Sequence, residues 1–256
     1  MITFTIGSVP YLNARPLTEW FEATDEGRAS NTDLSFAVPS ELAKPLEAGI
    51  LDAALISSIA WVRRPHLTYA PGIAVASGGP VRSVRLLSQV PIEKIRKVAL
   101  DGSSMTSVTL TRILVAERFL LTPEYTVRPP DLASMLSEAD AALLIGDPGN
   151  LDYDPNLLSI DLGETWTQWT GFPFVYALWV GAPERLTPER LALLTRAKEG
   201  GLENRADIAA RRGPEHGQSP ERALSYMTEA IRYNLGEREE AGLHLFAEKA
   251  RAHKLA

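Results

Sequence analysis

Residues 34–56 read LSFAVPSELAKPLEAGILDAALI, and this stretch decides the fold class. The strand-like runs at 34–38 and 53–56 predict two strands, and the helical pattern at 40–48 predicts a helix between them. A strand, a helix and another strand in this order form a crossover unit whose strands pair in parallel. The sequence therefore predicts an α/β protein.

The same alternation continues on the amino-terminal side of this stretch. Residues 2–6 are strand-like and residues 15–22 are helix-like, which completes a βαβαβ order. On the other side, strand-like runs at 73–76 and 83–88 flank Gly78-Gly79-Pro80. We interpret these two runs as a β-ribbon.

A second α/β unit follows, after which the chain returns to the first. Its strands and helices alternate at 98–100, 106–119, 125–128, 131–139 and 141–145. The apolar run at 172–180 predicts a strand that crosses back, and the helical segments from 188 to 256 are expected to pack on the first lobe.

This order predicts an α/β clamp with two lobes and a two-strand hinge. The expected first lobe is discontinuous and comprises residues 1–86 plus 175–256, and the second lobe comprises residues 87–174. Ligands of such architectures bind between the lobes, near the carboxyl ends of strands.

The composition excludes several classes of function. The net charge of -6 offers no basic surface to a nucleic acid, and the absence of cysteine excludes thiolate chemistry. No nucleotide-binding or zinc-hydrolase motif occurs, and His66, His216, His244 and His253 lie outside the expected cleft segments. We therefore expect no metal, no cofactor and no nucleic-acid partner.

The sequence also contains no sign of a membrane segment. No run approaches the ~18 consecutive apolar residues of a membrane helix, and the first residues lack the pattern of a secretory signal. We expect a cytoplasmic location, no membrane association and no stable protein partner.

Small polar residues recur where the predicted strands end, and these are the candidate cleft residues. They are Ser8, Tyr11, Asn13, Ser57, Ser58, Ser83, Ser103, Ser104, Thr106, Ser107, Gly146, Asp147, Thr170 and Gly171. A single serine in such a place commonly caps a helix or forms a turn, so the recurrence carries the prediction.

The strongest local signal is Asp101-Gly102-Ser103-Ser104-Met105-Thr106-Ser107, directly before the long predicted helix. Free N–H groups and the helix dipole favour a carboxylate there, although one of the serines is also suited to cap the helix. Asp147 lies in Gly-Asp-Pro-Gly, which is typical of a turn, and a role as a base would require a raised pKa.

Five segments together resemble the chorismate dehydratase family, the first enzymes of the futalosine route to menaquinone. The segments are SVPYLNARPL at 8–17, GPVRSV at 79–84, LDGSSMTS at 100–107, LIGD at 144–147 and WTGFPF at 169–174. The resemblance implies a type II periplasmic-binding-protein-like clamp that dehydrates chorismate, a dicarboxylate, to 3-[(1-carboxyvinyl)oxy]benzoate.

The resemblance also implies residue roles. It places Asn13 and Ser83 in catalysis or substrate contact and Ser103, Ser104, Thr106 and Ser107 in an anion-binding turn. The proton acceptor stays open between the substrate's own side-chain carboxylate and Asp147. Two alternatives are a small-anion binding protein of the same fold and a sister lyase acting on cyclic dehypoxanthine futalosine, which a histidine in the cleft would favour.

Overall fold

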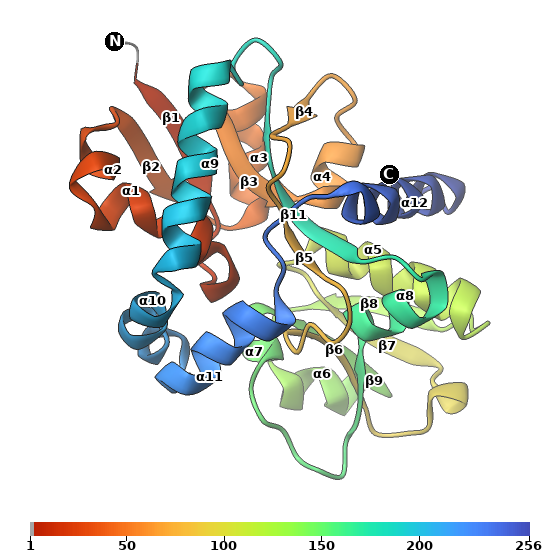
Figure 1. Cartoon of the computed structure of the whole chain (residues 1–256). Coiled ribbons are helices and arrows are strands. Elements are labelled where there is room, and N and C mark those ends of the chain that lie inside the picture. Colours follow the sequence, from red (N-terminus) through yellow and green to blue (C-terminus); the bar gives the residue numbers. More distant parts are fainter. Residues whose placement is uncertain (1–2) are drawn as a thin grey trace.

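The computed structural model describes residues 3–256, and the chain forms two β-sheets that occupy different parts of the molecule (Figure 1). The first sheet has the order β2-β1-β3-β11-β4, with β5 also paired to β11. Its strands are β1 (Phe4–Ser8), β2 (Thr32–Phe36), β3 (Ala53–Ser57), β4 (Thr68–Tyr69), β5 (Val75–Ser77) and β11 (Phe174–Gly181).

The amino-terminal strands pair in parallel, as the alternation of strands and helices predicts. β1 pairs with both β2 and β3, and α3 (Pro39–Glu47) crosses between β2 and β3. Leu42 and Leu46 of this helix are buried in the core, which anchors the crossover. The predicted strand at 2–6 corresponds to β1, and its residue Ile2 lies outside the described residues.

The second sheet has the order β10-β6-β9-β7-β8 and is also mixed. Its strands are β6 (Val84–Ser88), β7 (Lys97–Asp101), β8 (Glu124–Arg128), β9 (Ala141–Ile145) and β10 (Leu158–Asp161). β7 is parallel to β8 and β9, whereas β6 is antiparallel to β9 and β10. The helices of this unit are α5 (Met105–Ile113), α6 (Leu132–Glu138), α7 (Gly146–Gly149) and α8 (Leu162–Thr170), with the 3₁₀ turn η2 (Ile92–Lys94) and the π-helix η3 (Leu114–Arg118), which continues α5.

The prediction of a β-ribbon between the two units is wrong. β5 pairs with β11 in the first sheet, and β6 pairs with β9 and β10 in the second. The physical reason is that the Asp161 carboxylate accepts the backbone N–H groups of Val81 and Arg82, at 3.1 and 2.7 Å, which turns the chain into the second sheet. The lobe boundaries at residues 86 and 174 stay a prediction.

The helix predicted at 15–22 is not continuous, because its residues are shared between a 3₁₀ turn and a short α-helix. Residues Leu12–Leu17 form the 3₁₀ turn η1, and α1 (Glu19–Ala23) and α2 (Asp25–Ala29) follow it. Pro16 lies inside η1, where its missing N–H prevents a continuous α-helix.

The carboxyl-terminal region is mostly helical. Its elements are α9 (Pro188–Glu203), α10 (Arg205–Arg212), η4 (Pro214–His216), α11 (Pro220–Ser225), η5 (Tyr226–Ala230) and α12 (Glu237–Ala252). Residues 231–236 are not helical, and Arg232 pairs with Ala76 as an extra bridge on the first sheet.

These helices contact both units of the molecule. α9 packs on η1 and α1, but α12 also contacts α5, and Figure 1 shows it lying beside α4 (Ser58–Val62) and α5. Lys249 of α12 pairs with Glu117 of the second unit at 2.5 Å. No helix within residues 3–256 is both long and apolar enough to cross a membrane.

Candidate active site

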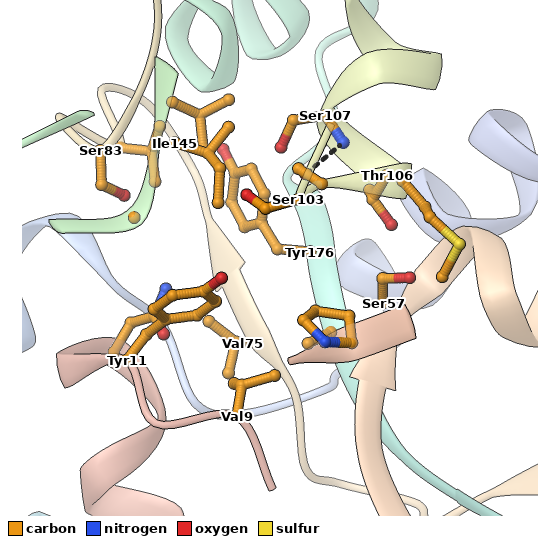
Figure 2. Close-up of a pocket in the computed structure, with 18 of the residues that line it drawn as sticks. Val9, Tyr11, Ser57, Val75, Ser83, Ser103, Thr106, Ser107, Ile145 and Tyr176 are labelled. Carbon is orange, nitrogen blue, oxygen red and sulfur yellow. Dashed lines mark hydrogen bonds between the residues drawn. The ribbon is translucent and has the colours of Figure 1, made fainter. Parts of the chain in front are cut away.

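A cavity of about 650 Å³, part of it open to solvent, lies where strand ends of the two sheets meet. Nine of the fourteen predicted site residues line it: Tyr11, Asn13, Ser57, Ser83, Ser103, Ser104, Thr106, Ser107 and Gly146. Figure 2 shows Tyr11 and Ser57 on one side of this space, facing Ser83, Ser103 and Thr106 on the other. Within the described chain, no charged side chain lines the cavity.

The second-sheet side of the cavity is built by the turn between β7 and α5. Asp101 accepts from the backbone N–H of Ser103 at 2.9 Å and from its hydroxyl at 2.7 Å, which fixes the turn. The Ser104 hydroxyl accepts the N–H of Ser107 at 3.2 Å, the dashed line in Figure 2, and so caps α5. Ser104 is therefore both a helix cap and a cavity residue, and the first turn of α5 opens on the cavity.

The opposite side contributes a second helix start. The backbone N–H of Ile59, in the first turn of α4, donates to the Thr106 hydroxyl at 3.1 Å and joins the two sides. Ser57, at the end of β3, lines the cavity, and within the described part of the chain its buried hydroxyl has no hydrogen-bond partner. Because a buried hydroxyl without a partner is costly, Ser57 is suited to bind a polar ligand.

Tyr11 closes the cavity near Gly146. Burial raises the pKa of the Tyr11 phenol, the hydrogen bond with Ser103 lowers it in part, and the negative charges of Asp101 and Asp147 raise it further. The phenol therefore stays protonated around neutral pH and remains able to donate a hydrogen bond. Gly146 has a φ of +63°, a conformation that suits glycine.

Two tyrosines that were not predicted from the sequence contribute to the site, one in the lining and one bonded to a lining residue. Tyr176 of β11 lines the cavity and shares a hydrogen bond with the Ser77 hydroxyl at 2.9 Å, and burial raises its pKa well above the usual value. Tyr226 donates from its hydroxyl to Ser83 Oγ at 2.7 Å. Tyr176 lies in the apolar run at 172–180, whose pattern predicts only a buried strand. Tyr226 is 143 residues from Ser83, so no local pattern indicates that the two side chains meet.

Four predicted substrate contacts do not line the cavity, and three of them bond backbone carbonyls through their hydroxyls. The Ser8 hydroxyl donates to the Val9 carbonyl and the Ser58 hydroxyl to the Val175 carbonyl. Thr170 donates to the Trp166 carbonyl at 2.8 Å at the end of α8, and Gly171 ends this helix with a φ of +76°.

Asp147 also lies outside the cavity lining. Its carboxylate is 2.6 Å from Nδ1 of His216, which the carboxyl-terminal turn η4 brings against α7. None of the four histidines in the described chain lines the cavity. The contact between His216 and Asp147 was not predicted from the sequence. No cluster of three or more His, Asp or Glu side chains within residues 3–256 is placed to hold a metal ion.

The chain forms two sheets, passes between them twice and encloses a cavity where they meet. This arrangement is that of the periplasmic-binding-protein fold. The chain aligns with the periplasmic aliphatic sulphonate binding protein of Escherichia coli at a TM-score of 0.67 and 15% identity, covering 99% of this chain and 88% of the other. A crystal structure from Archaeoglobus fulgidus aligns at a TM-score of 0.78 and 19% identity, covering 98% of both chains. These likenesses confirm the predicted fold class.

The sequence comparisons define the family. A family model described as menaquinone biosynthesis matches residues 4–252, and the chain belongs to that family. The chorismate dehydratase of Thermus thermophilus is 30% identical over 267 residues, 97% of this chain and 95% of its own length. That of Campylobacter jejuni is 31% identical over 175 residues, 67% of this chain and 64% of its own. The resemblance found in the sequence is therefore confirmed.

Proposed function

We propose that this chain is a chorismate dehydratase of menaquinone biosynthesis. It would convert chorismate to 3-[(1-carboxyvinyl)oxy]benzoate and water. The observation that carries the proposal is a cavity of hydroxyls and helix starts between two sheets, in a chain with a chorismate dehydratase relative along almost its whole length. Such a cavity suits a small dianion.

The substrate carboxylates need donors, and the cavity offers neutral ones. The first turn of α5 presents N–H groups and the dipole of the helix, and Ser57 and Thr106 add hydroxyls from both sides. We propose that the ring carboxylate lies at α5, where these donors stabilise the negative charge that accumulates on it. The two lobes would close on the substrate and exclude water.

The chemistry itself requires little acid or base strength from the protein. The hydrogen on the ring carbon that carries the ether is activated through the ring double bond by the ring carboxylate. Its loss as a proton, followed by loss of the neighbouring hydroxyl as hydroxide, gives an aromatic ring and one molecule of water. The gain of aromaticity supplies most of the driving force.

The proton acceptor in this proposal is the substrate's own side-chain carboxylate. No carboxylate of the described chain lines the cavity, and Asp147 is paired with His216 outside it, which argues against Asp147 as the base. Asn13 and Ser83 both line the cavity and would orient the enolpyruvyl ether or the departing hydroxyl.

The test is to incubate the purified chain with chorismate and follow the aromatic product by ultraviolet absorbance, with its identity checked by chromatography and mass. The unmodified chain should release product and water in equal amounts. Replacing Asn13 by Ala should lower turnover at least tenfold, which corresponds to ~1.4 kcal/mol of barrier. A chain that leaves chorismate unchanged would contradict the proposal.

One alternative has an observation in its favour, because the fold is shared with binding proteins such as the sulphonate receptor. A receptor would bind chorismate or another small anion and release it unchanged, so binding by calorimetry without product would favour that function. The sister lyase has less support, since His216 is engaged with Asp147 and does not line the cavity. A cytoplasmic location and the absence of a stable protein partner remain part of the proposal.

A further inference from the structure

Ser83 is held by a buried contact that comes from the far end of the chain. The phenol of Tyr226, at the start of η5, donates to Ser83 Oγ at 2.7 Å. Tyr226 is 2% exposed and Ser83 is 1% exposed, so water does not compete for this hydrogen bond. Ser83 lines the cavity, whereas Tyr226 is not among the residues that line it.

The residue before Ser83 fixes the segment that carries this tyrosine. The Arg82 guanidinium donates to the Ser225 hydroxyl at 2.8 Å and to the Glu229 carboxylate at 2.9 Å. Ser225 in turn donates to Glu229 at 2.8 Å. Tyr226 lies between these two residues, so Arg82 sets the position of the phenol relative to the neighbouring Ser83.

The backbone of Ser83 is constrained as well. Arg82 has a φ of +66°, which is unusual for arginine, and the Asp161 carboxylate holds its N–H at 2.7 Å. On the other side Gly149 approaches so closely that a Cβ there would lie 2.3 Å from the Ser83 carbonyl oxygen. The direction of the Ser83 O–H bond is then the main freedom left to this residue.

The direction of that O–H bond follows from the donor on its oxygen. Burial raises the pKa of Tyr226, hydrogen bonds with Ser83 and Asn13 lower it in part, and the charge of Asp147 raises it again. The phenol therefore remains a donor throughout the neutral pH range. Since Ser83 Oγ accepts this hydrogen, its own hydrogen must point elsewhere, and Ser83 lines the cavity.

We infer that Tyr226 is a positioning residue that orients the Ser83 hydroxyl as a hydrogen-bond donor toward the substrate. This inference rests on the proposed function. Without the phenol, the Ser83 hydroxyl would be free to rotate away from the substrate, so the effect should appear in turnover more than in substrate binding.

The experiment compares four chains in the chorismate assay: the unmodified chain, Tyr226→Phe, Ser83→Ala and the double variant. Tyr226→Phe keeps the ring and removes one oxygen, and kcat should fall about tenfold while KM changes less than threefold. If the phenol acts through the serine and not through its contact with Asn13, the double variant should be no slower than Ser83→Ala. If Tyr226 had a merely structural role, Tyr226→Phe would lower kcat by the same factor in the unmodified chain and in Ser83→Ala.

Tyr233→Phe is the matched control. Tyr233 is also buried and follows Tyr226 closely in the sequence, but its hydroxyl has no partner within the described chain, so kcat should change less than twofold. Thermal unfolding of each variant checks the fold. If Tyr226→Phe were poorly folded, a comparison of Ser83→Ala with the double variant would still test the inference. The double variant removes both hydroxyls of the pair and so leaves neither of them buried without its partner.

The outcomes separate this inference from the proposed function. An unmodified chain that forms no product contradicts the proposed function and removes the inference with it. An active unmodified chain with an equally active Tyr226→Phe overturns the inference alone. So does a double variant more than fivefold slower than Ser83→Ala.

Discussion

The two sides of the cavity are built differently. The first-sheet side presents side chains of several kinds, including the Tyr11 phenol, the Asn13 amide and the unpartnered Ser57 hydroxyl. The second-sheet side is the short turn before α5, with hydroxyls fixed by Asp101 and by the helix itself. In the proposed function the turn before α5, with Ser57 opposite it, holds charge, while Asn13 and Ser83 orient the neutral parts of the substrate. Among residues 3–256, neither side contributes a cationic side chain to the lining, so hydroxyls, N–H groups and the helix dipole are the donors offered to an anion.

The largest effect should come from breaking the second-sheet side. Thr106→Val keeps the shape of the side chain but removes a hydroxyl that lines the cavity and accepts from Ile59. A hydrogen bond to a charged group is worth about 1.5–3 kcal/mol, so chorismate affinity measured by calorimetry should fall tenfold or more. Thr111→Val is the control: its hydroxyl bonds the Ser107 carbonyl within the helix, and affinity should hold within twofold.

The contact between Gly149 of the second unit and Ser83, which lies between β5 and β6, should give the next largest effect. A methyl group at Gly149 would meet the Ser83 carbonyl, so Gly149→Ala should lower the free energy of unfolding by about 1–3 kcal/mol and slow turnover as Ser83 shifts. Gly79→Ala, where nothing lies within 4 Å, serves as the comparison. Equal stabilities of the two variants in urea denaturation would contradict a close contact between Gly149 and Ser83.

The first-sheet side should be more tolerant of a single deletion. Tyr11→Phe removes a hydroxyl near Ser103 and keeps the ring against Gly146. A hydrogen bond of a neutral group contributes about 0.5–1.5 kcal/mol, so kcat/KM should fall two- to tenfold, less than for Thr106→Val. Tyr125→Phe, on β8 and outside the cavity lining, should leave kcat/KM unchanged. A larger loss for Tyr11 than for Thr106 would reverse the proposed division of roles.

The smallest effect concerns stability and tests how the two units are joined away from the cavity. Burial raises the pKa of Glu117, but hydrogen bonds and charges from Lys249 and His253 outweigh it and leave the pKa below its usual value. A lowered pKa stabilises the folded chain above the unfolded value near ~4.3, and this stabilisation is lost as pH falls through the folded value. The unfolding free energies of the unmodified chain and Glu117→Gln should differ by about 1 kcal/mol or less at pH 6 and converge at pH 3. A difference that grows on acidification would contradict this assignment.

Much of the fold follows from short-range patterns. The strand at 141–145 coincides with β9, and the helix after Asp101-Gly102-Ser103-Ser104 begins as its cap predicts, because alternation, burial and capping act over a few residues. The same local logic identified nine cavity residues. It also selected Ser8, Ser58, Thr170 and Gly171, which do not line the cavity, since a small polar residue can bond a backbone carbonyl or end a helix as readily as it binds a ligand. Their contact with the substrate stays a prediction.

By itself the sequence determined the α/β class, the turn before α5 and the absence of any thiol chemistry. Only the tertiary structure decided which polar groups meet: Asp147 with His216, Ser83 with Tyr226, and α4 with α5 through Thr106. The physical reason is that helix and strand signals reflect interactions between near neighbours, whereas these pairs are joined by the double crossing and by carboxyl-terminal helices that reach both units. No local pattern encodes the distance between residues separated by 143 positions along the chain.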